Sequence, residues 1–417
     1  MKISKLAENI TSMICLKGSE YILNFILFPY LIRVLGVEKF GAITFMQGII
    51  QYGVILVDYG FYLTAPRDIA QSLEKKSISQ IFANVMISKI LIFIFISILS
   101  FIIIGTLLLL KIEFDILLFL SCYLLIVGNV IFPIWFFQGV QQMRYVTVFN
   151  IIARSITVLL VLLFVKNSDD YVLAAFFQSS TLLLAGIFSL IVLRKEFSYI
   201  FVAPDLGGIK EIFINGWHVF LSTVAINLYT TNNIVILGAM TNNAVVGYFG
   251  AANKLIDCTK GILLTINQAV YPYVSKKMIT CKNDALIFLK KYLFAYSGIA
   301  FLGGNCLIIF APIFVDILFG NGYNESAFLL RMMSYLPFIM SISNVFGIQI
   351  MMNFGYQKAF SKILISASIL DFFMIIPFIY YMESLGVIFT MIAVEMFVTV
   401  NTIYYVLVTK KIKLFSE

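Results

Sequence analysis

Ten charged side chains lie inside long apolar stretches of this 417-residue chain. Five are basic and five are acidic: Lys17, Lys89, Arg154, Lys254, Lys260, Glu20, Asp58, Asp257, Asp371 and Glu395. An ionised group in hydrocarbon costs several kcal/mol, so each of these groups is expected to face protein or water. Basic groups in such a place bind anions, whereas carboxyl groups bind protons or cations. The pattern therefore predicts a hydrated interior that handles charge.

Helical spacing places several of these groups on common faces, at steps of three and four residues. The faces are Lys17 with Glu20 and Asn24, Asn150 with Arg154 and Thr157, and Lys254 with Asp257. Arg154 lies about ten residues into its apolar stretch, roughly 15 Å deep at the helical rise. No acid lies three or four residues from Arg154, so its partner is either on another helix or an anionic ligand. A guanidinium binds phosphate oxygens through two parallel hydrogen bonds, which makes Arg154 the first candidate for substrate contact.

The candidate site residues, Arg154 included, fall into three groups. The predicted cationic cavity contains Lys17, Arg154, Lys254 and Lys260. The acids Glu20, Asp58, Asp257, Asp371 and Glu395 are predicted to be counter-charges or sites of H+ or Na+ coupling, and Asn24, His218 and Tyr229 are predicted sugar contacts. Pairing of Lys17 with Glu20 and of Lys254 with Asp257, which would only hold helices together, remains an open alternative. Asp58 and Arg67 lie nine residues apart, on opposite faces of a helix, and are not expected to pair.

Composition identifies the elements that must position these groups. Apolar residues make up 61% of the chain and charged residues only 12%, whereas soluble domains carry about 25% charge. Apolar stretches of about 20 residues, enough to cross a bilayer as a helix, recur along the whole chain. We therefore predict an all-α, polytopic membrane protein with twelve spans, at 9–34, 42–66, 84–110, 115–140, 145–165, 171–193, 212–238, 244–274, 289–315, 327–352, 360–381 and 386–408.

The loop charges predict the orientation. Of the 29 Lys and Arg residues, only five lie in the loops on one side, namely Arg33, Lys39, Lys111, Lys166 and Arg331. This asymmetry predicts that both termini are cytoplasmic. It also explains the net charge of +8 without a nucleic-acid partner. The five cysteines and one histidine form no metal-ligand pattern, so no cofactor or metal is expected.

Two short correspondences suggest an internal repeat. The distance from Gly41 to Pro66 is 25 residues, as is the distance from Gly247 to Pro272. The tetrapeptide QGVQ at 138–141 also has a counterpart, FGYQ, at 354–357. We predict two six-helix lobes, residues 1–200 and 201–417, related by a parallel repeat as in some alternating-access transporters. In the second lobe, a polar stretch at 229–233 suggests an interrupted helix, with a continuous helix end as the alternative.

Three segments carry a resemblance to a known family: LGVEKFGAITF at 35–45, LVDYGFYLTAPRDIA at 56–70 and PIWFFQGVQQM at 133–143. Together they resemble O-antigen and polysaccharide flippases of the Wzx type, in the multidrug/oligosaccharidyl-lipid/polysaccharide (MOP) flippase superfamily. The resemblance implies a two-lobed bundle with a cationic cavity in the bacterial inner membrane. It also implies translocation of undecaprenyl-pyrophosphate-linked sugar repeat units to the periplasmic leaflet. We further hypothesise that transport proceeds by alternating access and is driven by a H+ or Na+ gradient through Asp58, Asp371 or Glu395.

Expected partners are the lipid-linked oligosaccharide, the bilayer, and the polysaccharide polymerase with its chain-length machinery, and the chain is expected to function as a monomer. Two other functions remain open. A cation-coupled multidrug exporter of the same superfamily would use the buried acids, but five buried basic residues argue against a cationic cargo. A membrane glycosyltransferase or polymerase would need an extramembrane segment or a catalytic constellation, and the sequence shows neither.

Overall fold

The structure is a computed structural model that describes residues 2–72, 74–197, 202–410 and 412. Within it, the side chains of residues 2–17 and of several positions between 218 and 231 lie outside the description. The described residues form helices joined by short connections, and none of them is in a strand. The predicted all-α class is therefore confirmed.

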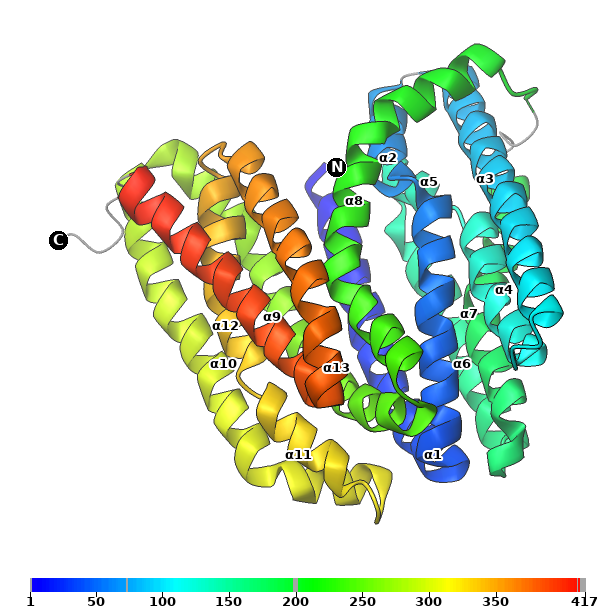
Figure 1. The fold of residues 1–417 in the computed structure, drawn as a ribbon. Coiled ribbons are helices and arrows are strands. Elements are labelled where there is room, and N and C mark those ends of the chain that lie inside the picture. Colours follow the sequence, from blue (N-terminus) through cyan, green and yellow to red (C-terminus); the bar gives the residue numbers. More distant parts are fainter. Residues whose placement is uncertain (1, 73, 198–201, 411, 413–417) are drawn as a thin grey trace. The chain divides into compact units, whose positions relative to one another are not determined.

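The helices follow one another with few residues between them (Figure 1). The α-helices are α1 (Lys2–Asp58), α2 (Phe61–Gln71), α3 (Lys75–Leu109), α4 (Ile116–Ile131), α5 (Ile134–Gly139), α6 (Met143–Phe164), α7 (Tyr171–Val192), α8 (Leu206–Met240), α9 (Asn243–Thr280), α10 (Lys282–Phe319), α11 (Asn324–Met333), α12 (Leu336–Asn344) and α13 (Gln357–Tyr404). A 3₁₀ turn, η1 (Ser168–Asp170), and three π-helical segments, η2 (Leu193–Phe197), η3 (Val345–Met352) and η4 (Tyr405–Thr409), complete the described elements.

Eight helical stretches among the described residues are long and apolar enough to cross a membrane. Two of them, 18–71 and 357–409, have 54 and 53 residues, far more than the roughly 20 that one crossing requires. Each of these contains a sharp bend, at Gly36 and at Glu383, where two predicted spans meet. The chain is a multi-pass membrane protein, while the count of twelve spans stays a prediction.

Glycine and proline explain three of the helix interruptions. Gly36 (φ 75°) lies in a left-handed conformation that other residues rarely adopt, and Gly60 (φ 80°) does so between α1 and α2. Pro133 separates α4 from α5 because it has no backbone N–H to continue the helix. The hypothesis of an interrupted helix at 229–233 is wrong: α8 continues through these residues, which contain neither glycine nor proline.

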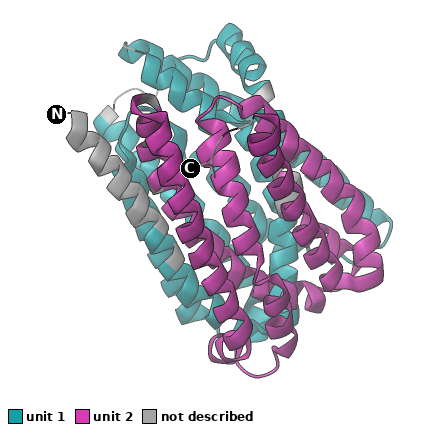
Figure 2. Ribbon diagram, turned by 90° about the vertical axis from the view of Figure 1, so that its left-hand side faces the viewer, with its two compact units in different colours: residues 1–224 teal, residues 225–417 magenta. Residues whose placement is uncertain are grey.

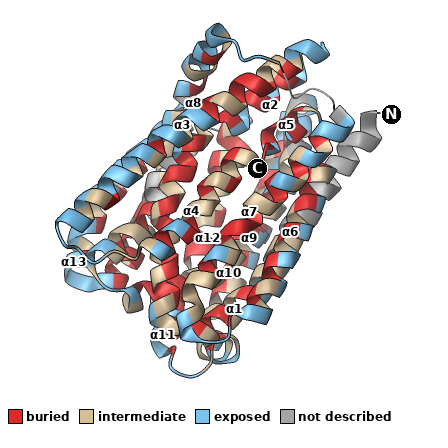
Figure 3. Ribbon diagram, turned by 90° about the vertical axis from the view of Figure 1, so that its right-hand side faces the viewer, coloured by how far each residue is buried: buried red, intermediate tan, exposed pale blue. Residues whose placement is uncertain are grey.

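The chain divides into two compact units, Met1–Val224 (unit 1) and Ala225–Glu417 (unit 2), coloured separately in Figure 2. The lobes predicted at 1–200 and 201–417 rest on two short sequence correspondences. They and the parallel repeat remain predictions. In unit 1, the outer face of α3 is apolar and exposed, with Phe95, Phe101 and Ile102 each more than half exposed (Figure 3). A lipid environment accounts for such a face, as the membrane assignment requires.

The described residues of unit 1 include two apolar core clusters. One joins α1, α3, α4, α6 and α7 and includes Leu31, Ile43 and Ile126. The other joins α2, α5, the first part of α3, the start of α6 and the end of α7, and includes Phe61 and Phe136. The interruption at residues 59–60 separates α1, which belongs to the first cluster, from α2, which belongs to the second. The interruption at residues 132–133 separates α4 from α5 in the same way. The polar groups at these interruptions therefore lie at the junction of the two cores.

Candidate functional site

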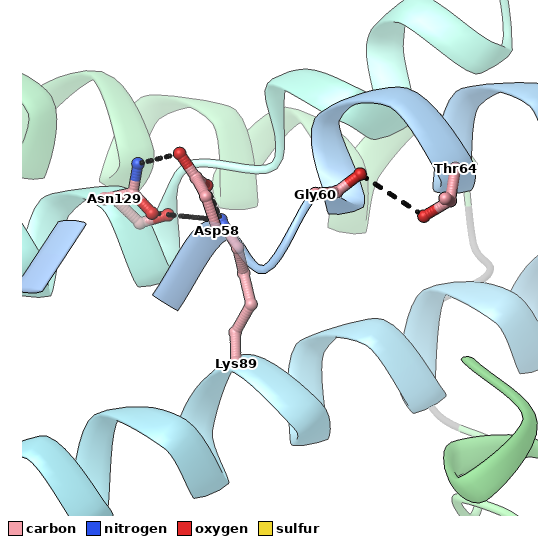
Figure 4. Close-up of polar contacts among 5 residues, drawn as sticks. All are labelled: Asp58, Gly60, Thr64, Lys89 and Asn129. Carbon is pink, nitrogen blue, oxygen red and sulfur yellow. Dashed lines mark hydrogen bonds and ion pairs between the residues drawn. The ribbon is translucent and has the colours of Figure 1, made fainter. Parts of the chain in front are cut away.

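Lys89 on α3 lies at that junction and is 2% exposed. Its ammonium group donates to Asp58 Oδ1 at 3.0 Å, to the Asn129 carbonyl at 3.0 Å and to Asn129 Oδ1 at 3.1 Å (Figure 4). Asn129 in turn donates its side-chain amide to Asp58 Oδ2 at 3.3 Å. All three ammonium protons of Lys89 have acceptors, as a fully buried lysine requires.

The local sequence explains why these groups meet. Asn129 precedes Pro133 by four residues, so the helical N–H that would bond the Asn129 carbonyl is missing. Lys89 supplies that missing donor. Asp58 is the last residue of α1, immediately before Tyr59 (φ 41°) and Gly60 turn the chain into α2. Lys89 thus connects two helix interruptions and neutralises the acid at one of them.

Asp58 and Arg67 do not pair, as the sequence predicted. Arg67 bonds the neighbouring Asp68 at 3.1 Å at the surface. Asp58 is the counter-charge of Lys89, one of the two roles predicted for it. Lys89 had no predicted role, although the Asn129–Pro133 spacing could have shown that a donor was needed there.

Arg154 on α6 finds its partners on α1. Its Nη2 lies 3.4 Å from Glu20 Oε1, and its Nη1 donates to Asn24 Oδ1 at 3.0 Å. The two charged side chains remain 22% and 32% exposed. A guanidinium has five N–H donors, so donors remain for an anionic ligand. Of the two alternatives for Arg154, the structure shows a partner on another helix. The alternative pairing of Glu20 with Lys17 lies outside the described side chains.

We expect Arg154→Gln to weaken binding of a phosphate-bearing lipid about tenfold or more, because a charge-assisted hydrogen bond contributes about 1.5–3 kcal/mol. Arg154→Lys should retain more of the binding, since it keeps the charge but loses the two-pronged geometry. The measurement is the dissociation constant of that lipid for each purified variant in detergent. Arg331→Gln, in the last turn of α11, is the matched control, and equal binding by Arg154→Gln and Arg331→Gln would remove Arg154 from the site.

Unit 2 contains a cavity of about 340 Å³ that is lined by both polar and apolar side chains. Its lining residues are Asn233, Ile234, Asn253, Asp257, Lys260, Met340, Asp371, Met391, Val394 and Glu395. Four of the predicted charged residues therefore share one cavity, although they come from α9 and from two distant parts of α13. With three acids and one lysine in its wall, the cavity is suited to a small cation or a proton.

Asp371 is the least solvent-exposed of these acids, at 1%. Its Oδ2 has no hydrogen-bond partner among the described residues, whereas Asp257 accepts a bond from Asn253 Nδ2 at 2.9 Å. A buried carboxylate oxygen without a partner is costly, and binding a proton or a cation would relieve that cost. No group of three or more His, Cys, Asp or Glu residues in the described part of the chain could hold a metal ion together.

The structure describes the surroundings of the other predicted site residues only in part. Lys254 is half-buried on α9, one turn before Asp257, and does not line the cavity. The side chains of Lys17, His218 and Tyr229 lie outside the described part, so their predicted roles stay predictions.

Comparison with known proteins identifies the family. Residues 6–278 match the family described as "Polysaccharide biosynthesis protein". The chain is also 37% identical over 395 residues to the "Putative O-antigen transporter" of Escherichia coli (strain K12), covering 94% of this chain and 95% of that protein. The chain belongs to this polysaccharide biosynthesis family. A second family relative of the same name, from Shigella dysenteriae, is 28% identical over 94% of this chain and 97% of its own.

Solved structures show the same fold at low identity. A lipid II flippase, MurJ, in an inward closed conformation matches with a TM-score of 0.75 at 13% identity, over 95% of this chain and 87% of its own. An inward-facing MATE multidrug resistance transporter of the MOP superfamily matches with a TM-score of 0.70 at 14% identity, over 95% and 96%. This family member therefore has the fold of these transporters. The family match and the O-antigen transporter relative confirm the predicted resemblance. It is a transporter and not an enzyme, in agreement with the names of its two relatives.

Proposed function

We propose that this protein flips undecaprenyl-pyrophosphate-linked O-antigen or related repeat units from the cytoplasmic to the periplasmic leaflet of the bacterial inner membrane. The observation that carries the proposal is the likeness to O-antigen transporters along almost the whole chain. The chemistry of unit 1 supports it, because Arg154 keeps donors and partial exposure for a phosphate group. The loop charges support cytoplasmic termini. The polymerase and chain-length partners and a monomeric state remain expectations.

We also propose that the cycle is ion-coupled through the cavity of unit 2. Asp371 would bind a proton or Na+ when the cavity is open to one side of the membrane and release it on the other. Lys260 and the acids Asp257 and Glu395 would set the charge that the entering cation meets. Alternating access then links ion movement to movement of the lipid-linked sugar.

A cation exporter is the second candidate, because the acid-lined cavity of unit 2 also suits a cationic cargo. A leaflet assay with purified protein in vesicles separates the two functions. We expect a lipid-linked oligosaccharide to move between leaflets at a rate that responds to an imposed H+ or Na+ gradient, and a cationic dye to stay in place. Movement of the dye alone would contradict the flippase proposal.

A further inference from the structure

One end of unit 2 carries a surface of lysines, which we call the lysine surface. Its members are Lys276, Lys277, Lys282, Lys290, Lys291, Lys358, Lys362 and Lys410, from the α9–α10 junction, the start of α13 and the chain after η4. Side-chain contacts bring these segments together. Ser275 bonds Asn353 at 2.6 Å, and Lys410 lies 4.9 Å from the centre of the Tyr356 ring. The red C-terminal end lies beside the yellow-green α9–α10 junction in Figure 1.

Aromatic rings support the lysine surface. Lys282 lies 4.6 Å from the Phe354 ring centre, and Lys277 lies 5.7 Å from that of Tyr273. The Phe354 and Tyr356 rings are stacked at 6.2 Å. A lysine over an aromatic ring keeps its charge directed outward while its aliphatic stem covers the ring. Side chains of this combination are typical of the boundary between hydrocarbon and water.

The excess of Lys and Arg in cytoplasmic loops explains the lysines on this surface, but it does not explain why acidic residues are scarce there. The described segments 273–292, 353–364 and 404–410 contain eight lysines and a single acid, Asp284. Loops of unit 1 predicted for the same side of the membrane, at 67–76, 144–145 and 194–211, contain seven basic residues and five acids among their described positions. The orientation rule depends on Lys and Arg and hardly on Asp and Glu, so it is satisfied equally in both units. Because acidic residues are few on the lysine surface, its electrostatic potential is positive and attracts anions.

Apolar side chains adjoin the lysine surface, which indicates the kind of anion it would meet. Ile287 is 57% exposed, Ile365 is 42% exposed and Val408 is 54% exposed, each within a few residues of one of the lysines. A ligand that carries a phosphate on a hydrocarbon tail can contact both the lysines and the apolar side chains next to them. An acidic protein segment would leave the apolar part uncovered.

We propose that the lysine surface binds the headgroups of anionic phospholipids in the cytoplasmic leaflet. Each lysine close to an anionic bilayer adds to the attraction, and clusters of four to eight are typical of such binding. The bound lipid would hold this end of unit 2 at the membrane surface. This inference concerns bulk phospholipid and does not depend on which cargo is transported.

The test compares two fourfold variants of the full-length protein. The first is Lys277→Gln/Lys282→Gln/Lys358→Gln/Lys410→Gln. The matched control removes the same number of charges from unit 1: Arg67→Gln/Lys75→Gln/Lys76→Gln/Lys195→Gln. Binding of phosphatidylglycerol and of phosphatidylcholine to each purified protein is measured by native mass spectrometry. We expect phosphatidylglycerol to bind the first variant about tenfold more weakly than native protein, with little change in the control. The corresponding fourfold Lys→Arg variant should bind like native protein.

Three outcomes would overturn the proposal: equal losses in the two Gln variants, equally tight binding of phosphatidylcholine, or weakened binding in the Lys→Arg variant. A competition arm adds undecaprenyl phosphate to phosphatidylglycerol at equal concentration. If undecaprenyl phosphate displaces nearly all of the phosphatidylglycerol, the surface belongs to the substrate and the assignment to bulk phospholipid is wrong. Coexistence of the two lipids supports it. Because cargo movement is measured separately by the leaflet assay, failure of this inference and failure of the proposed function can be told apart.

Discussion

Replacing Lys89 with methionine should destabilise unit 1 by about 1–3 kcal/mol, as leaving buried polar groups unsatisfied does, because Asp58 is 28% exposed and stays partly hydrated. Methionine fills a similar volume, so packing is largely preserved. The loss arises because Asp58 Oδ1 and the Asn129 carbonyl both lose the Lys89 donor, while Asp58 Oδ2 keeps only its bond from the Asn129 side chain. The measurement is the free energy of unfolding in detergent. Lys76→Met, an exposed position on the same helix, is the control and should change stability by a few tenths of a kcal/mol.

Two second-site changes test the cause of that destabilisation. Asp58→Asn added to Lys89→Met removes the uncompensated charge, so it should restore part of the lost stability. Pro133→Ala added to Lys89→Met provides a backbone N–H that can bond the Asn129 carbonyl, and it should restore a further part. If both double variants are as unstable as Lys89→Met alone, Lys89 stabilises the fold in some other way. A reversed pair, Asp58→Lys with Lys89→Asp, should fail, because aspartate cannot donate to the carbonyl.

Asp371→Asn should abolish the dependence of transport on an ion gradient while leaving the protein at least as stable as native. Asparagine cannot ionise, so the cavity of unit 2 would lose the group that we propose takes up the proton or cation. We expect gradient-driven transport to fall by roughly tenfold or more, equivalent to about 1.4 kcal/mol or more. The change also replaces a buried carboxylate that has an unpartnered oxygen, so the Tm should stay level or rise.

The measurements for Asp371 are the leaflet assay with and without an imposed gradient, and thermal unfolding of the same preparations. Asp284→Asn is the control, because Asp284 is exposed at the start of α10 and lies outside the cavity. Unchanged gradient-driven transport by Asp371→Asn would rule out Asp371 as the coupling group. A large fall in Tm together with the loss of transport would instead indicate a structural role.

Several features of the fold could be predicted from local sequence. The apolar stretches gave the membrane class, because only a helix satisfies its own backbone groups in hydrocarbon. The bend at Gly36 lies in the predicted connection between the first two spans. The polar stretch at 229–233 was misleading, because polar side chains alone do not interrupt a helix whose backbone is fully bonded. The interruption at Pro133 was not predicted as such, although Pro133 lacks the N–H that would continue α4.

The sequence by itself determined that this protein crosses a membrane, that it belongs to a polysaccharide biosynthesis family, and which few charged residues lie within its apolar stretches. Only the tertiary structure decided their partners. Lys89 meets Asp58 across 31 residues, and Arg154 meets Asn24 across 130, while Asp257 and Lys260 line one cavity with Asp371 and Glu395. The reason is physical: helical periodicity gives the face of one helix on which a residue lies, whereas the rotation and neighbours of that helix depend on packing between distant segments.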